Sequence, residues 1–128
     1  MLRKLISDQR QLPAADAVYT GLGHATFATA FIWSTTQVKL LFENGSELQF
    51  DGTSWGIGLA GGISWGAGLF GVPPDKLIGS CNYQQNLTAV FSQVTFWNDN
   101  GALGSFQGAS IGVGGSATGG GGSWKKAS

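Results

Sequence analysis

Apolar residues alternate with small or polar residues along most of the chain, and this period of two is typical of β-strands. From residue 17 onward, short runs of β-branched and aromatic residues follow the alternation, and glycine or Asn-Gly signals separate them. The segment 73–79 interrupts this pattern, because it has proline at the first helical position and glycine after the last. The sequence therefore predicts an all-β protein with one short helix near residues 74–79.

The strand pattern repeats at an offset of 56 residues. The identical pairs are Gln37/Gln93, Val38/Val94, Asn44/Asn100, Gly45/Gly101, Phe50/Phe106, Gly52/Gly108, Ser54/Ser110, Gly56/Gly112 and Gly58/Gly114. Five of these pairs are not glycine, so the glycine-rich composition does not explain the agreement. Ser64-Trp65 and Ser123-Trp124 extend the repeat if three residues are inserted. A solenoid needs about three stacked units to bury a core, so two copies predict two halves of one closed domain.

The first copy of the repeat also predicts a hairpin register. A two-residue turn on Asn44 and Gly45 would place Leu40 opposite the polar Gln49. A three-residue loop with Gly45 left-handed in a G1 bulge pairs Leu40 with Leu48 instead, which gathers apolar side chains on one face. The same rule applied to both copies predicts inward-facing Val38, Leu40, Leu48, Phe50, Val94, Phe96 and Phe106.

In the second copy, this register predicts an apolar patch on the outside. The loop 99–101 turns Trp97 outward, opposite Leu103, where the first copy has Leu41 opposite Glu47. Exposed aromatic residues commonly anchor protein interfaces, lipid headgroup contacts or stacked sugars. We therefore predict Trp97, Leu103 and Leu41 as candidate surface-binding residues. The alternative is that the N-terminal segment or the short helix covers them.

The glycine-rich segments after each hairpin keep the period of two. Trp55, Ile57, Leu59, Ile63, Trp65 and Leu69 share one face, and Ser54 and the intervening glycines share the other. A Gly-x-Gly run binds phosphate where it leads from a strand into a helix N-terminus. No helix is predicted after these runs, so they indicate sharp bends or close strand approach in a barrel rather than a nucleotide site.

Catalytic and metal-binding residues are scarce. His24 is the only histidine and has no carboxylate or thiol nearby in the sequence, and Cys81 is the only cysteine. A lone buried cysteine behaves as a small hydrophobe, and structural zinc sites typically take four ligands. The acidic residues fall at turn tips or on the polar faces of strands, where they are too solvated for acid–base work. We therefore predict no catalytic residues, no cofactor and no metal, and hence no enzyme.

Charge separates the ends of the chain from its body. Residues 1–16 and 125–128 hold five basic and two acidic residues, a net charge of +3, whereas residues 17–124 hold two basic and five acidic residues, a net charge of −3. Such a body lacks the basic face that binds nucleic acid. We predict an N-terminal tail or short helix at 1–16, one barrel domain at 17–124 and a C-terminal tail at 125–128, with an oligomeric state that the sequence does not specify.

Localisation signals are absent from the printed sequence. The first ten residues contain only Leu5-Ile6 as an apolar core, which is too short for a signal peptide. No segment reaches the roughly 18 apolar residues of a spanning helix.

Three glycine- and tryptophan-rich stretches resemble the virulence-associated (Vap) proteins of an intracellular actinobacterial pathogen. They are residues 50–66 (FDGTSWGIGLAGGISWG), residues 96–109 (FWNDNGALGSFQGA) and the ending at Ser123-Trp124, and the resemblance covers about residues 17–124. It implies a closed eight-stranded antiparallel barrel of two Greek-key halves with a pseudo-twofold repeat, and no recognised catalytic site. It also implies an exported protein, because the members of the family are exported. Some of them act on phagosome maturation, with lipid membranes implicated as targets.

Three functional hypotheses follow. The first is a non-enzymatic, virulence-associated effector that acts through its outer face on a host membrane lipid or a protein partner. The alternative is a small glycan-binding module, in which Trp97 or another outward tryptophan stacks on sugar rings. A third possibility is a module that oligomerises through the face formed by Trp97 and Leu103.

Overall fold

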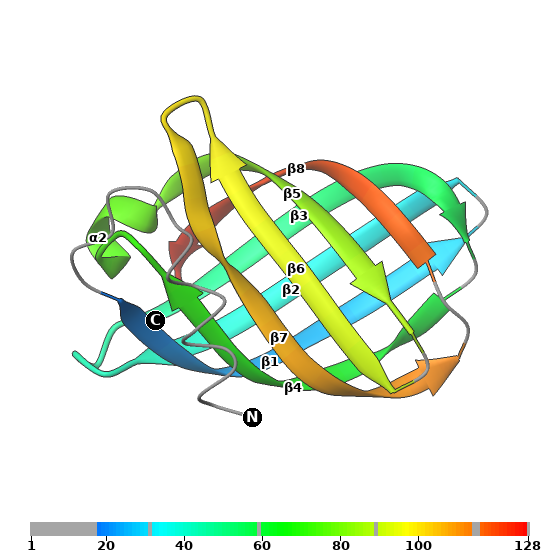
Figure 1. Cartoon of the computed structure of the whole chain (residues 1–128), viewed down its shortest axis with the longest axis horizontal. Coiled ribbons are helices and arrows are strands. Elements are labelled where there is room, and N and C mark those ends of the chain that lie inside the picture. Colours follow the sequence, from blue (N-terminus) through cyan, green and yellow to red (C-terminus); the bar gives the residue numbers. More distant parts are fainter. Residues whose placement is uncertain (1–17, 31, 59, 89, 114–115, 128) are drawn as a thin grey trace.

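In the computed structural model, the chain forms a closed barrel of eight antiparallel strands, as predicted (Figure 1). The structure describes residues 18–30, 32–58, 60–88, 90–113 and 116–127. The elements are β1 (Tyr19–Ala30), β2 (Trp33–Phe42), β3 (Glu47–Gly58), β4 (Ala60–Phe70), α2 (Pro74–Leu77), β5 (Gly79–Leu87), β6 (Phe91–Asn98), β7 (Gly101–Val113) and β8 (Ser116–Lys126). The predicted tail or helix at residues 1–16 lies outside the described residues.

The strand order is consistent with two Greek-key halves. Around the barrel, the order is β1-β2-β3-β8-β5-β6-β7-β4, so β4 lies beside β1 and β8 lies beside β5. In each half, the fourth strand therefore returns to the first, as in a Greek key. Phe50 lies opposite Trp124 on β8, and Phe106 lies opposite Gly68 on β4, as an offset of 56 residues requires.

The predicted three-residue insertion in the repeat is wrong. The strand register equates Trp124 with Gly68 and not with Trp65. Trp124 is 1% exposed inside the barrel, whereas Trp65 is 51% exposed on its surface. The shared Ser-Trp pair is therefore a similarity of sequence between positions that face opposite sides of the sheet.

The first hairpin has the predicted register. Val38 pairs with Phe50 and Leu40 pairs with Leu48. The loop closes through hydrogen bonds from Phe42 N to Ser46 O (2.8 Å) and from Gly45 N to Phe42 O (2.9 Å). Gly45 has φ +88°, a left-handed conformation that glycine adopts without steric cost. The predicted three-residue loop, which aligns the apolar positions, is therefore confirmed for the first hairpin.

The second hairpin differs from its prediction. Phe96 pairs with Gly104 as expected, but Trp97 pairs with Ala102, and the β-bulge lies at Leu103 instead of at the turn. In a bulge, one extra residue is inserted into one strand and re-aims the neighbouring side chains. At this bulge, Leu103 is buried and joins the core. The predicted pairing of Trp97 with Leu103 is therefore wrong.

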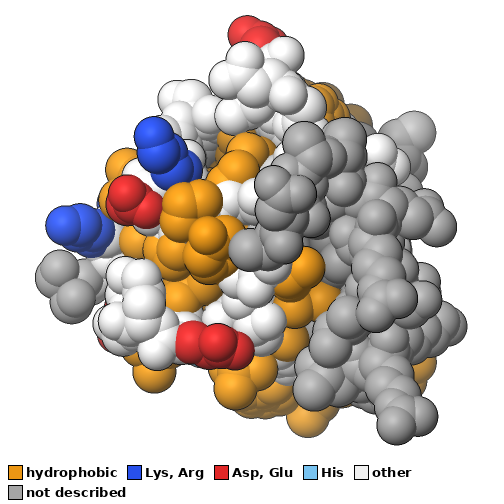
Figure 2. Space-filling view, turned by 60° about the vertical axis from the view of Figure 1, so that its left-hand side comes forward, with side chains coloured by type: hydrophobic (Ala, Val, Ile, Leu, Met, Phe, Trp, Pro, Cys, Tyr) orange, Lys and Arg blue, Asp and Glu red, His pale blue; other side chains and the backbone are white. Residues whose placement is uncertain are grey.

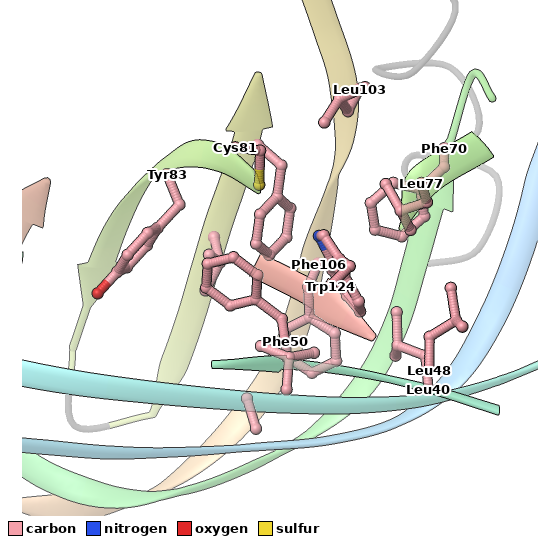
Figure 3. Packing of buried hydrophobic residues seen from close by; sticks show 14 of the residues in the cluster. Leu40, Leu48, Phe50, Phe70, Leu77, Cys81, Tyr83, Leu103, Phe106 and Trp124 are labelled. Atoms are coloured by element: carbon pink, nitrogen blue, oxygen red, sulfur yellow. The ribbon is translucent and has the colours of Figure 1, made fainter. Parts of the chain in front are cut away.

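Aromatic side chains fill the interior at one end of the barrel (Figure 3). The Phe50 ring contacts the rings of Tyr83, Phe96 and Trp124, with centroids 5.1, 4.9 and 5.4 Å apart. The predicted inward residues Val38, Leu40, Leu48, Phe50, Val94, Phe96 and Phe106 are all buried. Leu77 of α2 also packs into this cluster, so the short helix covers the same end.

Small polar side chains fill much of the interior toward the other end. The buried members of this group are Ser34, Thr36, Ser54, Ser64, Gln85, Ser92 and Thr118. Gln85 extends from β5 to β2, where its Nε2 donates to Ser34 Oγ (3.0 Å) and its Oε1 accepts from Thr36 Oγ1. Further bonds join Ser54 to Thr118 (2.9 Å) and Ser92 to Ser64 (2.6 Å). The barrel interior therefore changes from aromatic to polar along its axis.

Candidate functional site

The three surface residues predicted from the sequence do not form one site. Leu41 is 55% exposed on β2, Trp97 is 37% exposed on β6, and Leu103 is only 6% exposed. The strands β2 and β6 lie on opposite sides of the closed barrel, with three strands between them in either direction. Leu41 instead pairs with the exposed Leu22 of β1. The burial of Leu103 also removes one residue from the predicted oligomerisation face.

Charge is concentrated at the aromatic-cored end. Residues 17–38, 52–74, 77–98 and 100–124 contain no Asp, Glu, Lys or Arg. The charged residues of the barrel therefore lie in or near the 43–46 loop, in α2, in the 99–100 turn and at the last two residues of β8. Figure 2 shows acidic and basic side chains gathered around apolar ones at this end. We call it the charged end.

The opposite end, where β1–β2, β3–β4, β5–β6 and β7–β8 connect, has exposed apolar residues in place of charge. We call this surface the apolar end; its members are Ile32, Trp33, Trp55, Trp65, Val90, Phe91 and Ile111. On one side, Trp65 lies opposite Ala109 and Ala109 opposite Phe91, in a row across β4, β7 and β6. On the other side, Trp33 lies opposite Trp55. The sequence placed Trp55 and Trp65 on one face of their strands but gave no sign that this face was the outer one.

A shallow groove of about 430 Å³ runs along the outer face of β2, β3 and β8. Its lining includes Thr35, Gln37, Asp51, Thr53 and Gly121. The groove was not predicted from the sequence, because β8 reaches β3 only through closure of the barrel. The only sign of the groove in the sequence was the alternation of apolar and polar residues, which placed Asp51 on the polar face of its strand.

The Asp51 carboxylate is the most strongly held polar group of the groove. Gln37 Nε2 donates to its Oδ1 (3.1 Å), and Gln49 Nε2 (2.8 Å) and Lys125 Nζ (3.2 Å) contact its Oδ2. Partial burial raises the pKa of Asp51, but these hydrogen bonds and the charge of Lys125 outweigh it and hold the pKa below its ordinary value of 3.8. Asp51 is therefore an ionised hydrogen-bond acceptor at neutral pH.

Within the described residues, the structure contains no cluster of side chains that could hold a metal ion. No group of three or more His, Cys, Asp and Glu side chains comes together there. Burial raises the pKa of the Cys81 thiol to about 11, and the neighbouring Trp124 only partly opposes this shift. Such a thiol is protonated and unreactive at neutral pH. Among the described helices, none has the length and apolar composition needed to cross a bilayer.

Two solved structures share this fold. The virulence-associated protein VapD of the intracellular pathogen Rhodococcus equi superposes with a TM-score of 0.72 and 22% sequence identity, covering 85% of this chain and 97% of VapD. VapB of the same organism gives a TM-score of 0.64 and 20% identity, covering 86% of this chain and 99% of VapB. At this level of identity, the likeness establishes the fold alone.

Sequence comparison establishes the family. Comparison with curated protein sequences finds no match. The model of the Rhodococcus equi virulence-associated protein family, however, matches residues 8–125, which is most of the chain. The barrel agrees with that match, since VapD and VapB share its fold. This chain belongs to the Rhodococcus equi virulence-associated protein family.

Proposed function

We propose that this chain is a non-enzymatic, virulence-associated effector domain that binds a host membrane through the apolar end of its barrel. The observation that supports the proposal is the exposure of three tryptophans and four other large apolar side chains on an end of the barrel without charged residues. Tryptophan is favoured at the boundary between water and lipid, since its ring is apolar and its N–H is polar. A surface without charge also inserts without the cost of desolvating an ion.

The apolar end suits a bilayer better than it suits the expected protein partner. Its members surround the barrel on both the β2–β3 side and the β4–β7–β6 side, so they point in different directions around one axis. A bilayer surface can contact all of them at once if the barrel inserts end-on, whereas a flat protein surface can contact one side. Each large apolar side chain moved out of water contributes about 1.5–3 kcal/mol.

Flotation with lipid vesicles tests this proposal. We expect the protein to float with phosphatidylcholine vesicles, with or without phosphatidylserine, and to do so at both low and high salt because the apolar end carries no charge. The double variant Trp65→Ser/Ile111→Ser should weaken binding by about tenfold or more, since each lost apolar contact is worth roughly 1.5 kcal/mol or more.

The matched control is Leu22→Ser/Leu41→Ser, which removes two exposed apolar side chains outside the apolar end. This control should float like the wild type. If no vesicle binds, or if the control variant loses binding and the Trp65/Ile111 variant does not, the apolar end is not the membrane site. Binding to a host protein through the apolar end, without flotation, would replace the membrane by a protein partner.

A further inference from the structure

We infer that the groove on the outer face of β2, β3 and β8 is a binding site for a neutral oligosaccharide. The groove runs along the side of the barrel, and its lining includes none of the apolar-end residues, although Trp33 and Trp55 of the apolar end adjoin it. Its volume of about 430 Å³ falls within the range of roughly 300–1,000 Å³ that is usual for small-molecule sites.

Glycine residues of β8 make the floor of the groove flat. The packing of the barrel does not require glycine at all of these positions. Gly120 and Gly122 of β8 face inward, where an added Cβ atom would lie 2.1 Å from Thr53 O and 2.3 Å from Asp51 O respectively. Gly119 and Gly121 face outward, and an added Cβ atom would meet only one backbone oxygen, at 3.6 Å in each case, and at Gly121 also Asn82 Oδ1 at 4.0 Å. The fold therefore requires glycine at 120 and 122 but accommodates a side chain at 119 and 121.

Polar groups suited to sugar hydroxyls lie on two sides of Gly121, in the groove lining on β3 and beside the groove on β5. On β3, the Asp51 carboxylate is held by Gln37, Gln49 and Lys125 and remains ionised at neutral pH. A carboxylate has about four acceptor positions, so it can accept from a ligand hydroxyl in addition to these partners. On β5, Asn82 lies opposite Gly121, and its amide faces the solvent side of the barrel. Amides and carboxylates of this kind match the donor and acceptor pairs of a sugar ring.

An aromatic platform adjoins the groove. Trp55 follows Thr53 on the same face of β3, and Trp33 lies opposite it on β2. The two rings meet edge to face, with centroids 4.6 Å apart and an interplanar angle of 83°. This contact orients the Trp55 ring, which is nevertheless 62% exposed. A ring that is fixed and exposed can stack on the apolar C–H face of a pyranose next to the polar groove.

The charge of the groove selects a neutral ligand. Asp51 and Lys125 form an ion pair at 3.2 Å, so their charges offset one another. The lining residues include no Lys or Arg, so no unpaired basic side chain of the lining is available for a phosphate, sulfate or carboxylate group. The lining combines polar groups of Gln37 and Asp51 with apolar surface from threonine and glycine residues, and a neutral sugar likewise combines hydroxyl groups with apolar ring faces. Charge and polarity thus both favour a neutral oligosaccharide.

Titration of the full chain with maltohexaose, cellohexaose and mannohexaose, followed by NMR and calorimetry, tests the inference. At least one of these neutral probes should bind and shift the backbone signals of β3 and β8. Trp55→Ala should weaken that binding roughly tenfold through loss of stacking. Gly121→Val should weaken it at least as much by filling the groove, and valine is well tolerated in strands.

Two control variants match these changes elsewhere on the barrel. Trp65→Ala removes an exposed tryptophan of β4, and Gly61→Val adds a side chain where the new Cβ atom would meet only Phe27 O at 3.7 Å. Both should bind the probe like the wild type. Absence of binding to all three probes, or equal losses in the control variants, would overturn the inference. Gly121→Val should still float with vesicles, so failure of the glycan site is distinguishable from failure of the membrane proposal.

Discussion

The two ends of the barrel have opposite arrangements of polar and apolar side chains. At the charged end, aromatic rings such as Phe50 and Phe96 are inside, and charged residues such as Glu43 and Asp99 are outside. Toward the apolar end, hydroxyl and amide groups are inside, and tryptophans are outside. The same strands run through both ends, and inward and outward positions alternate along their whole length. The apolar residues occupy the inward positions at one end and the outward positions at the other.

This inversion shows how the barrel is divided between stability and exposed surface. Burial of the aromatic cluster supplies a large hydrophobic contribution at the charged end. The interior toward the apolar end gains less, since a buried hydrogen bond contributes only about 0.5–1.5 kcal/mol net. The large apolar side chains that would strengthen that interior face solvent instead. We interpret them as residues kept for contact with another molecule.

The largest effect is expected at the aromatic cluster. Phe50→Ala removes a buried ring that contacts three other aromatic rings, and it should lower the free energy of unfolding by about 3–5 kcal/mol. Denaturant unfolding monitored by tryptophan fluorescence measures this change. The exposed Thr53→Ala on the same strand should stay within about 0.5 kcal/mol of the wild type. A loss below 1 kcal/mol for Phe50→Ala would show that the aromatic cluster is not the stabilising end.

A smaller effect is expected in the polar interior. Gln85→Ala leaves the buried hydroxyls of Ser34 and Thr36 without their amide partner, which should cost about 1–3 kcal/mol. The neighbouring Gln84 faces outward, so Gln84→Ala is the matched control and should leave stability nearly unchanged. Chemical denaturation of both variants checks this. If Gln85→Ala cost as much as Phe50→Ala, the two interiors would contribute equally and the contrast between the ends would fail.

The smallest effect at neutral pH concerns Cys81, next to the aromatic cluster. Burial raises its pKa from 9.0 in the unfolded chain to about 11 in the folded protein. The unfolded chain therefore loses the thiol proton first, and the stability held below pH 9.0 should decline as pH rises from 9.0 to about 11.

Unfolding of the wild type and of Cys81→Ala at pH about 8 and about 10 isolates this contribution. The wild type should lose more stability across the interval than the variant, because only the wild type has the thiol. Equal losses would mean that the Cys81 thiol is as solvated in the folded protein as in the unfolded chain. The interior near the charged end would then be wetter than its burial indicates.

Much of the fold was predictable because local pattern and core formation agree. The first hairpin combined a glycine suited to φ +88° with apolar positions that align in one register. The second hairpin has the same turn residues, yet its bulge moved to Leu103. Burying a leucine contributes about 1.5–3 kcal/mol, and Leu103 is buried in the core. A tertiary gain of this kind has no local signal in the sequence.

The candidate sites were less predictable, because alternation does not indicate which face is inside. In the pair Gln49-Phe50, the aromatic residue is in the core and the polar residue is on the surface. In the pair Ser54-Trp55, the aromatic residue is on the surface instead. The glycines at 119 and 121 are indistinguishable in sequence from those at 120 and 122, which packing requires. Only strand closure shows that Gly121 lines a groove and that Gly120 and Gly122 approach a neighbouring backbone closely.

Closure of the barrel also limits how this protein can recognise anything. Each of the eight strands is hydrogen-bonded to a neighbour on both sides, so the sheet offers no open edge to an incoming strand. A peptide cannot be captured by β-augmentation, in which main-chain hydrogen bonds supply the affinity. Recognition must instead use side chains on the barrel surface and the turns at its ends, which can change between relatives without disturbing the hydrogen-bonded sheet.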